Sequence, residues 1–167
     1  MENTLKHINS LVNEGIILKY AIGGGIASLY YLEATVTFDL DVMVILSVDE
    51  NSLWPLKELY EWARKHGFPE KEEHIVIDNI PVQFLPAYND LVKEAVENAK
   101  KVVIQNAETY IITPEYLIAI MLQTGRGKDK FRVQQFFDEV AIDKNLLNQV
   151  LEKYSLKSKL DSVLKND

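Results

Sequence analysis

Two acidic side chains separated by one residue, Asp39 and Asp41, stand at the start of a strand predicted at residues 38–46. Successive side chains of a strand alternate between its faces, so both carboxylates share a face, with Cα atoms about 7 Å apart. Carboxylate oxygens are the ligands of hard cations such as Mg²⁺. The other face of this strand is apolar throughout, so two like charges lie beside a buried strand, which is unfavourable without a counterion. The pattern predicts a cation site, although an acidic strand end in water would also explain it.

Three consecutive glycines, Gly23, Gly24 and Gly25, follow a strand predicted at 19–22 and precede a helix predicted at 26–33. A turn without side chains lets the backbone approach a ligand closely, and its amides and the helix N-terminus favour an anion such as a triphosphate. A tight turn that needs positive φ would explain the glycines equally well. The spacing up to Ser28 is G-x-G-x-x-S, which is neither a full dinucleotide fingerprint nor a P-loop.

The glycine turn, followed by a helix and by the T-x-D-x-D segment that begins at Thr37, resembles the DNA polymerase beta-like nucleotidyltransferase superfamily. It is most similar to the small prokaryotic members related to abortive-infection toxins and antibiotic adenylyltransferases. The resemblance implies an α/β (α+β) fold, a mixed sheet flanked by helices with a C-terminal helical subdomain. It also implies that the glycines and Thr37 bind the nucleotide and that Asp39 and Asp41 hold Mg²⁺ (or Mn²⁺).

In that superfamily a third carboxylate, on a later strand, completes the site and helps to activate the attacking hydroxyl. The corresponding strand is predicted at 80–85, and the position of the acid is occupied by Gln83. A glutamine can form hydrogen bonds, but it cannot take a proton or supply a negatively charged ligand. Asp78 is a possible substitute, although Asn79 beside it favours a solvent-facing hairpin turn. Thr35 stands where many small members have an arginine.

A second part of the resemblance covers a helix predicted from Pro114 to just before Gly125, followed by a basic stretch. Related proteins often have a lysine on this helix, near the position of Gln123. Four cations lie within seven residues, and they could contact the nucleotide or an acceptor phosphate; of these we assign Arg126 and Lys128 to the nucleotide. A solvated turn with cations near a helix end is the alternative. The four cations are Arg126, Lys128, Lys130 and Arg132.

Composition narrows the class without identifying a substrate. The 167 residues are 47% hydrophobic, enough for a buried core, and the net charge of −7 argues against broad nucleic-acid affinity. The absence of cysteine excludes disulfides and thiolate chemistry, and no apolar segment indicates a signal peptide or membrane span, so we expect a cytoplasmic protein. The three histidines are dispersed, and each is expected to be a surface or structural residue. They are His7, His66 and His74.

The remaining periodicity predicts an α/β core over residues 1–112 and a helical subdomain over 113–167 that packs on it. Helices are expected at 4–14, 53–66 and 91–99, with Trp54 among the core contacts, and strands at 74–78, 80–85 and 101–105. After residue 114 the chain is expected to be helical at 128–140, 144–154 and 156–164.

We therefore expect a metal-dependent nucleotidyltransferase, which moves a nucleoside monophosphate from a nucleoside triphosphate to a hydroxyl or phosphate acceptor. The acceptor is open: a small molecule such as an antibiotic, a protein side chain or a tRNA end. A catalytically weakened nucleotide-binding module, such as a toxin-antitoxin partner, is the alternative that Gln83 favours. A Rossmann-like dinucleotide site is disfavoured, because it needs its acid at the C-terminal end of a strand.

Overall fold

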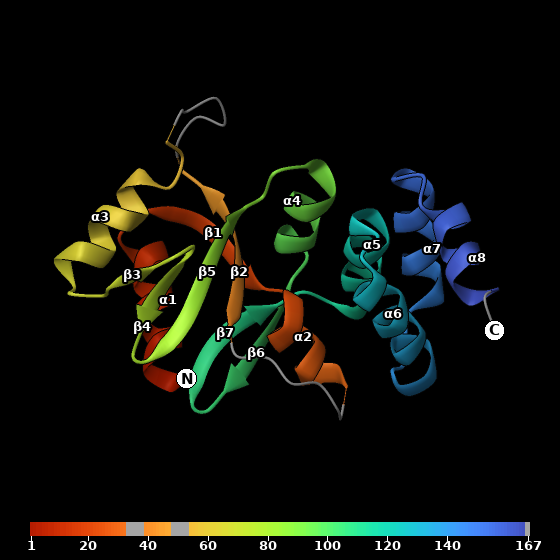
Figure 1. The fold of residues 1–167 in the computed structure, drawn as a ribbon, viewed down its shortest axis with the longest axis horizontal. Coiled ribbons are helices and arrows are strands. Elements are labelled where there is room, and N and C mark those ends of the chain that lie inside the picture. The colour runs from red at the N-terminus through yellow and green to blue at the C-terminus, as the bar shows by residue number, and fades with distance from the viewer. Residues whose placement is uncertain (33–38, 48–53, 166–167) are drawn as a thin grey trace.

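The computed structural model describes residues 1–32, 39–47 and 54–165. These residues form an α/β fold with eight helices and a mixed seven-stranded sheet (Figure 1). The elements are, in chain order, α1 (Glu2–Asn13), β1 (Ile17–Ile22), α2 (Gly24–Tyr31), β2 (Leu40–Leu46), α3 (Lys57–Lys65), β3 (Glu70–Lys71), β4 (His74–Ile77), β5 (Ile80–Pro86), α4 (Asp90–Glu97), β6 (Lys100–Ile104), β7 (Ala107–Ile111), α5 (Pro114–Thr124), α6 (Gly127–Glu139), α7 (Lys144–Lys153) and α8 (Lys157–Leu164).

Strand β2 lies in the middle of the sheet, whose strand order is β3-β4-β5-β2-β1-β7-β6. It pairs antiparallel with β1 and parallel with β5, while β5 pairs antiparallel with β4. Leu40, Val42 and Val44 are completely buried, as expected for a strand with neighbours on both sides. Any side chain on the opposite face of β2 is therefore held by a rigid support.

The β4–β5 hairpin has a two-residue turn at Asp78 and Asn79, whose φ angles are 50° and 65°. Positive φ at both central residues defines a type I′ turn, which matches the twist of the two strands. Such a turn fixes the register, and the ladder pairs Ile77 with Ile80 and Ile75 with Val82. The predicted hairpin is confirmed, and its turn determines which residues of β4 and β5 lie side by side.

Helices α5 to α8 lie together on one side of the sheet, with α2 and α4 between them and the strands (Figure 1). Every residue of α5 from Pro114 to Leu122 is buried. A helix that is buried on every face must be surrounded, and α5 packs against α2, α4, α6 and α7. It ends at Gly125, whose φ of 69° gives the left-handed conformation that favours glycine. None of the helices in the described part of the chain is long and apolar enough to cross a membrane.

Several sequence-based expectations about the elements need correction. The strand predicted at 38–46 begins at Leu40, so Asp39 lies in a bend immediately before it. Strands β3 and β7 were not predicted, although β7 alternates between buried and exposed side chains. Trp54, expected in the core, is 76% exposed. The division at residues 112 and 113 stays a prediction.

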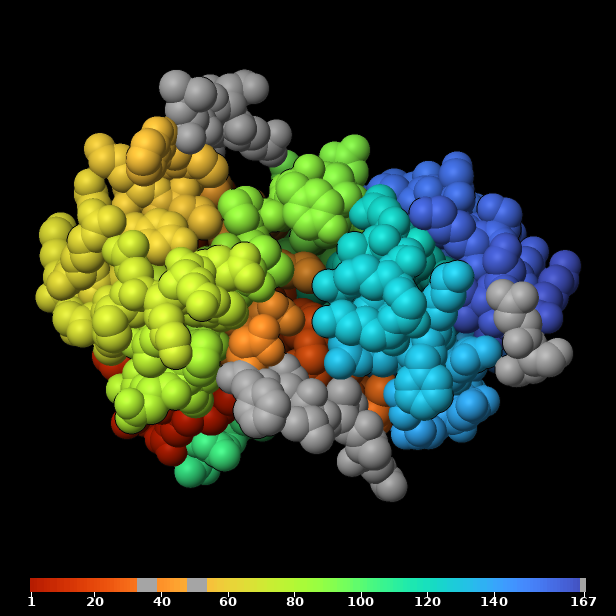
Figure 2. All heavy atoms as spheres, viewed as in Figure 1, coloured from red at the N-terminus to blue at the C-terminus, as the bar shows by residue number. Residues whose placement is uncertain are grey.

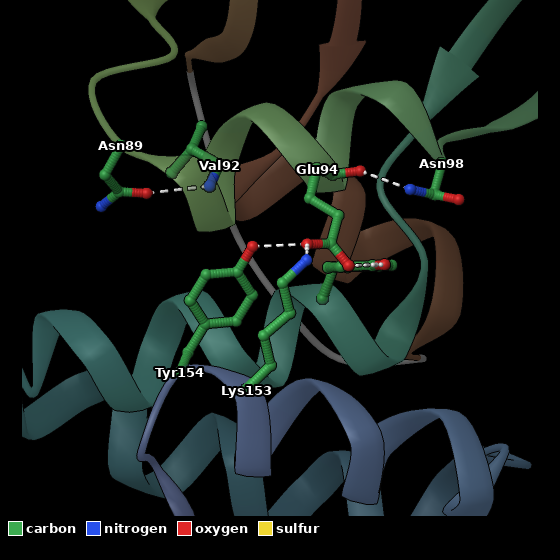
Figure 3. Close-up of polar contacts among 7 residues, drawn as sticks. Asn89, Val92, Glu94, Asn98, Lys153 and Tyr154 are labelled. Atoms are coloured by element: carbon green, nitrogen blue, oxygen red, sulfur yellow. Dashed lines mark hydrogen bonds and ion pairs between the residues drawn. The ribbon is translucent and has the colours of Figure 1, made fainter.

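The partly buried carboxylate of Glu94 connects α4 to the C-terminal helices. Its Oε1 accepts a hydrogen bond of 2.9 Å from the Tyr116 hydroxyl of α5, and its Oε2 accepts bonds from Lys153 Nζ, at 2.5 Å, and from the Tyr154 hydroxyl. Figure 3 shows Lys153 and Tyr154 pointing from the end of α7 towards this carboxylate. Burial acts to raise the pKa of the Glu94 carboxyl, but its three donors outweigh burial and hold the pKa below its usual value.

We expect Glu94→Gln to lower the melting temperature at pH 7 by about 2–8 °C, or about 1–2 kcal/mol, because charge-assisted bonds become neutral ones. The lysine is mostly exposed, so most of this loss comes from the two tyrosines. A depressed carboxyl pKa stabilises the fold above the unfolded value, and this contribution is lost as the pH falls through the folded value. The difference between parent and variant should therefore shrink below about pH 4.5.

Thermal unfolding followed by circular dichroism at pH 7 and at pH 3.5 measures both effects. The exposed Glu97→Gln on the same helix is the matched control and should leave the melting temperature unchanged within about 1 °C. Equal melting temperatures for parent and Glu94→Gln at pH 7 would contradict a stabilising role for the hydrogen bonds of Glu94.

Candidate functional site

The carboxylate of Asp41, the second residue of β2, lies against the first turn of α2. A Cβ added to Gly24 would come within 1.7 Å of Asp41 Oδ2, so no other residue type fits there while the carboxylate stays in place. Gly24 also has a φ of 53°, which favours glycine. The backbone amide of Gly23 donates to the Asp41 carbonyl at 2.9 Å, which joins the glycine turn to the strand. The glycine run is thus shaped around the aspartate.

The electrostatic environment of Asp41 disfavours the ionised form of its carboxylate. Burial raises the pKa of the Asp41 carboxyl above its usual value, and the neighbouring charge of Asp39 raises it further. A backbone hydrogen bond from Gly25 and the charges of Arg126 and Lys128 act in the opposite direction without cancelling the effect. Since the amide of Gly25 is directed at this carboxylate, it stabilises the ionised form, as expected at a helix N-terminus.

Three neighbouring strands place a row of polar side chains on the face that carries Asp41. Asp41 pairs with Gln83 of β5 in the parallel ladder, and one step beyond the Ile75–Val82 pair puts His74 opposite Gln83. Directly paired residues share a face of the sheet. The Nε2 atom of His74 is buried and has no hydrogen-bond partner, and it lies 3.8 Å from Oδ2 of Asp39. The predicted third-acid position is therefore directly beside Asp41, and it holds an amide.

A cavity of about 300 Å³, which we call the central cavity, opens above Asp41. Figure 2 shows this recess between the yellow-green β4–β5 hairpin and the cyan helices α5 and α6, with orange atoms of β2 at its base. Its lining combines the polar floor, an apolar wall from the sheet and α5, and two cations, one at the start of α6 and one within it. The lining includes Gly24, Ser28, Asp41, Gln83, Met43, Leu85, Leu117, Ile120, Met121, Thr124, Arg126, Asp129 and Arg132.

Arg126 is held by a carboxylate at the rim of the central cavity. Its Nε donates to Oδ2 of Asp129 at 2.7 Å, and Asp129 is only 1% exposed, whereas the Arg126 side chain is 57% exposed. A buried carboxylate needs a charged partner, so Asp129 fixes one edge of the guanidinium and leaves its remaining donors for other groups. This arrangement presents a positively charged group to whatever occupies the cavity.

The structure brings together some predicted residues and separates others. Asp41, Gly24, Gln83 and Arg126 all line the central cavity, and the charge of Lys128 reaches Asp41. Gly23 and Gly25 contact Asp41 through their backbones, while Asp39 lies beside His74. Thr35 and Thr37 lie outside the described residues.

Three other residues named from the sequence lie away from the central cavity. Asp78 is in the hairpin turn, where its Oδ2 lies 3.7 Å from Nε2 of His7, so it does not replace the missing acid. Lys130 lines a different hollow, between α5, α6 and α8. Gln123 accepts a hydrogen bond of 2.7 Å from Asn89, the residue that caps the start of α4, and does not line the central cavity.

Three residues of this region were not assigned to the site from the sequence. His74 was interpreted as a surface or structural residue, yet the predicted turn at Asp78 already implied that it faces Gln83. Arg132 was named only as one of four cations, and it lines the cavity three residues after Asp129, on the same face of α6. No sequence signal marks Asp129 as the buried partner of Arg126, because an Asp near a helix start is usually solvated.

Comparisons with known proteins agree with this architecture. No protein-family model matches the sequence, and no curated protein sequence matches it. One similar solved structure is an antigenic nucleotidyltransferase-like protein from Paracoccidioides brasiliensis, with a TM-score of 0.50 and 12% identity over 98% of this chain and 92% of that one. Another is ANT(2″)-Ia in complex with adenylyl-2″-tobramycin, with a TM-score of 0.50 and 17% identity over 90% of this chain and 97% of that one. The chain therefore has a nucleotidyltransferase-like fold, consistent with the resemblance to the DNA polymerase beta-like superfamily.

We expect Gly24→Ala to destabilise the fold more than Gly67→Ala. Gly67 has a similar φ of 74° but open space around it, so it reports the backbone strain alone, about 1 kcal/mol. Gly24→Ala adds the collision with Asp41, which we expect to cost a further 1–3 kcal/mol, roughly as overpacking does. Urea unfolding of both variants measures the difference.

A double substitution identifies the collision partner. Asp41→Ala in the Gly24→Ala background should recover stability beyond its effect on the parent, because the carboxylate that meets the new Cβ is gone. Purely additive free energies of unfolding would contradict the close fit of glycine and aspartate.

Asp41→Asn is expected to unfold about 2–4 °C higher than the parent at pH 7 in EDTA, or about 1 kcal/mol. The raised pKa means that the native state binds the proton more tightly than the unfolded chain does. The ionised carboxylate therefore lowers the free energy of unfolding by its full amount above the folded pKa and not at all below the unfolded value. The gain should therefore vanish as the pH falls towards 3.8. Asp138→Asn, at an exposed position of α6, is the matched control, and a lower melting temperature for Asp41→Asn would show a stabilising role instead.

Proposed function

We propose that the protein is a metal-dependent nucleotidyltransferase that moves a nucleoside monophosphate from a nucleoside triphosphate to a hydroxyl or phosphate acceptor. The acceptor oxygen attacks the α-phosphorus, the bond from that phosphorus to the oxygen bridging to the β-phosphate breaks, and pyrophosphate leaves. The proton of a hydroxyl acceptor passes to solvent, and a phosphate acceptor brings none. The observation that carries the proposal is the Asp41 carboxylate, desolvated against the glycine turn and facing a cavity with cations at its rim.

Asp39 and Asp41 are the residues that would hold Mg²⁺ or Mn²⁺. Among the residues that the structure describes, no group of three or more His, Cys, Asp or Glu side chains forms a metal cluster. A pair of carboxylates nevertheless suits Mg²⁺, which keeps several waters and is commonly bound by one or two carboxylates together with substrate phosphates. The raised pKa of Asp41 and the like charge of Asp39 are unfavourable features that a cation removes, so the residues fit the ion. When bound, such an ion neutralises charge on the phosphates.

Cations of α6 and its start would bind the triphosphate. Arg126 is presented to the central cavity by Asp129, Lys128 lies close enough for its charge to lower the pKa of Asp41, and Arg132 lines the same cavity. Guanidinium groups match phosphate oxygens through paired hydrogen bonds. We assign the nucleotide to this side of the cavity, with Gly23, Gly24 and Gly25 leaving its approach to Asp41 free of side chains.

Gln83 favours a second candidate function, a nucleotide-binding module with weak or no catalysis, such as one component of a toxin-antitoxin pair. Its amide lies directly beside Asp41 in the ladder, where an acid would assist the attacking hydroxyl. The unfavourable pair of carboxylates favours the enzyme, because a module that only binds a partner gains nothing from it.

A cytoplasmic location and a protein partner stay predictions, and the acceptor is a small molecule, a protein or a tRNA end.

Transfer of label from α-phosphate-labelled nucleoside triphosphates tests the proposal, with Mg²⁺ and a pool of tRNA, total protein and antibiotics as acceptors. We expect label in one acceptor class, a loss of about 100-fold or more with Asp41→Asn, and no change with the exposed Asp138→Asn. Gln83→Asp should raise the rate about tenfold or more for a hydroxyl acceptor, because a carboxylate can take its proton. Calorimetry should show that EDTA abolishes binding of the triphosphate.

The outcomes separate the two candidates. A parent that binds triphosphate with Mg²⁺ but transfers no label, even after Gln83→Asp, is the binding module. A parent that binds no triphosphate with or without Mg²⁺ contradicts both functions.

A further inference from the structure

His74 lies beside Asp39, and the proposed function leaves it unused. Its Nε2 is shielded from solvent and makes no hydrogen bond, which is costly for a ring nitrogen unless a ligand satisfies it. The nearest carboxylate oxygen, Oδ2 of Asp39, lies 3.8 Å away, which is too far for a hydrogen bond. The Nε2 atom of His74 therefore has a carboxylate oxygen nearby but no hydrogen bond to it.

The separation of 3.8 Å is compatible with a single ion between the two atoms. Divalent transition ions lie about 2.0–2.2 Å from imidazole nitrogen and carboxylate oxygen, so one ion can reach donor atoms up to about 4 Å apart. The hydrogen-bonded pairing of a protonated histidine with a carboxylate would bring the atoms closer, to about 2.7–2.9 Å. Distance and burial together thus fit a shared ion better than a direct bond.

The His7–Asp78 pair shows why distance alone is not sufficient. Its Nε2 and Oδ2 atoms are 3.7 Å apart, almost the same separation, but both side chains are more than a third exposed and water can satisfy them. The His7 ring also packs edge-on against the Phe68 ring, with the two centroids 4.9 Å apart. In contrast, the side chain of His74 is 19% exposed, its Nε2 is buried, and it belongs to the row that contains Gln83 and Asp41.

We propose that His74 is a metal ligand which, together with Asp39, makes this site prefer a first-row transition ion to Mg²⁺. The inference rests on the proposed function, which it deepens by naming the class of ion. Mg²⁺ takes oxygen ligands almost exclusively, whereas imidazole nitrogen strengthens binding along the series from Mn²⁺ to Zn²⁺. Gln83 adds a neutral amide oxygen in the same row, and the imidazole adds a further donor atom from the next strand.

Binding of metal ions alone, without nucleotide, tests this assignment. Co²⁺ and Mg²⁺ are titrated by calorimetry, and the visible absorption of Co²⁺ reports a nitrogen ligand. The parent should bind Co²⁺ at least ten times more tightly than Mg²⁺. His74→Phe, which keeps a ring of similar size, and His74→Asn should each lower Co²⁺ affinity at least tenfold and change Mg²⁺ affinity by less than twofold. His7→Phe is the matched control and should change neither affinity.

Melting temperatures show which variants are folded before any titration, and two different replacements at position 74 keep the test decisive if one of them does not fold. Co²⁺ affinity and absorption that are the same in the parent and a folded position-74 variant would overturn the role of His74, as would an equal loss of Co²⁺ and Mg²⁺ affinity. The result is independent of triphosphate binding. If the parent binds triphosphate with Mg²⁺ and the position-74 variants still bind Co²⁺ as the parent does, only the role of His74 is contradicted. If the parent binds Co²⁺ through His74 but binds no triphosphate, the role of His74 is supported and the proposed function is contradicted.

Discussion

The close fit of one carboxylate to a helix start without side chains determines the arrangement of this protein. Asp41 needs Gly24 because even a methyl group would overlap its Oδ2, and it needs the amide of Gly25 because burial disfavours its charge. Both requirements hold only if α2 begins where β1 ends, next to the first residues of β2. The antiparallel pairing of β1 and β2 in the centre of the sheet meets this condition, and completely buried leucine and valine side chains support it from behind.

The second wall of the central cavity depends on α5, a helix that is buried on all sides. Helices pack on several of its faces, so packing determines its position. The hydrogen bonds of the Glu94 carboxylate then fix α4 to α5 and α7. Gly125 then reverses the chain, so that Arg126 and the first turn of α6 face back towards Asp41. The charges of the site therefore come from chain segments more than eighty residues apart, which only the packing of the C-terminal helices brings together.

Most of the elements and the pair of aspartates could be predicted from local patterns, because strand alternation, glycine turns and helix ends are written in a few neighbouring residues. Strand β7 was missed although Gln105 and Asn106, with φ angles of 47° and 67°, form the same kind of turn as Asp78 and Asn79. Asp39 was placed within a strand, whereas the ladder starts one residue later. The burial of Asp129 and the missing hydrogen bond of His74 Nε2 could not be predicted, because both depend on the side chains that surround them, and single-sequence patterns do not report those.

The tight turn between β4 and β5 also has an evolutionary consequence. Its length alone decides that His74, and not a neighbour, stands opposite Gln83, because a slip of one residue in a ladder sends every side chain to the other face. The pairing of Gln83 with Asp41 runs through a different ladder and would survive such a slip. An insertion or deletion in a surface loop can therefore exchange the nitrogen donor at the site for an apolar side chain, while every residue around the carboxylates keeps its identity. Relatives of this chain can thus diverge in the chemistry of the site through loop length, without a single substitution inside it.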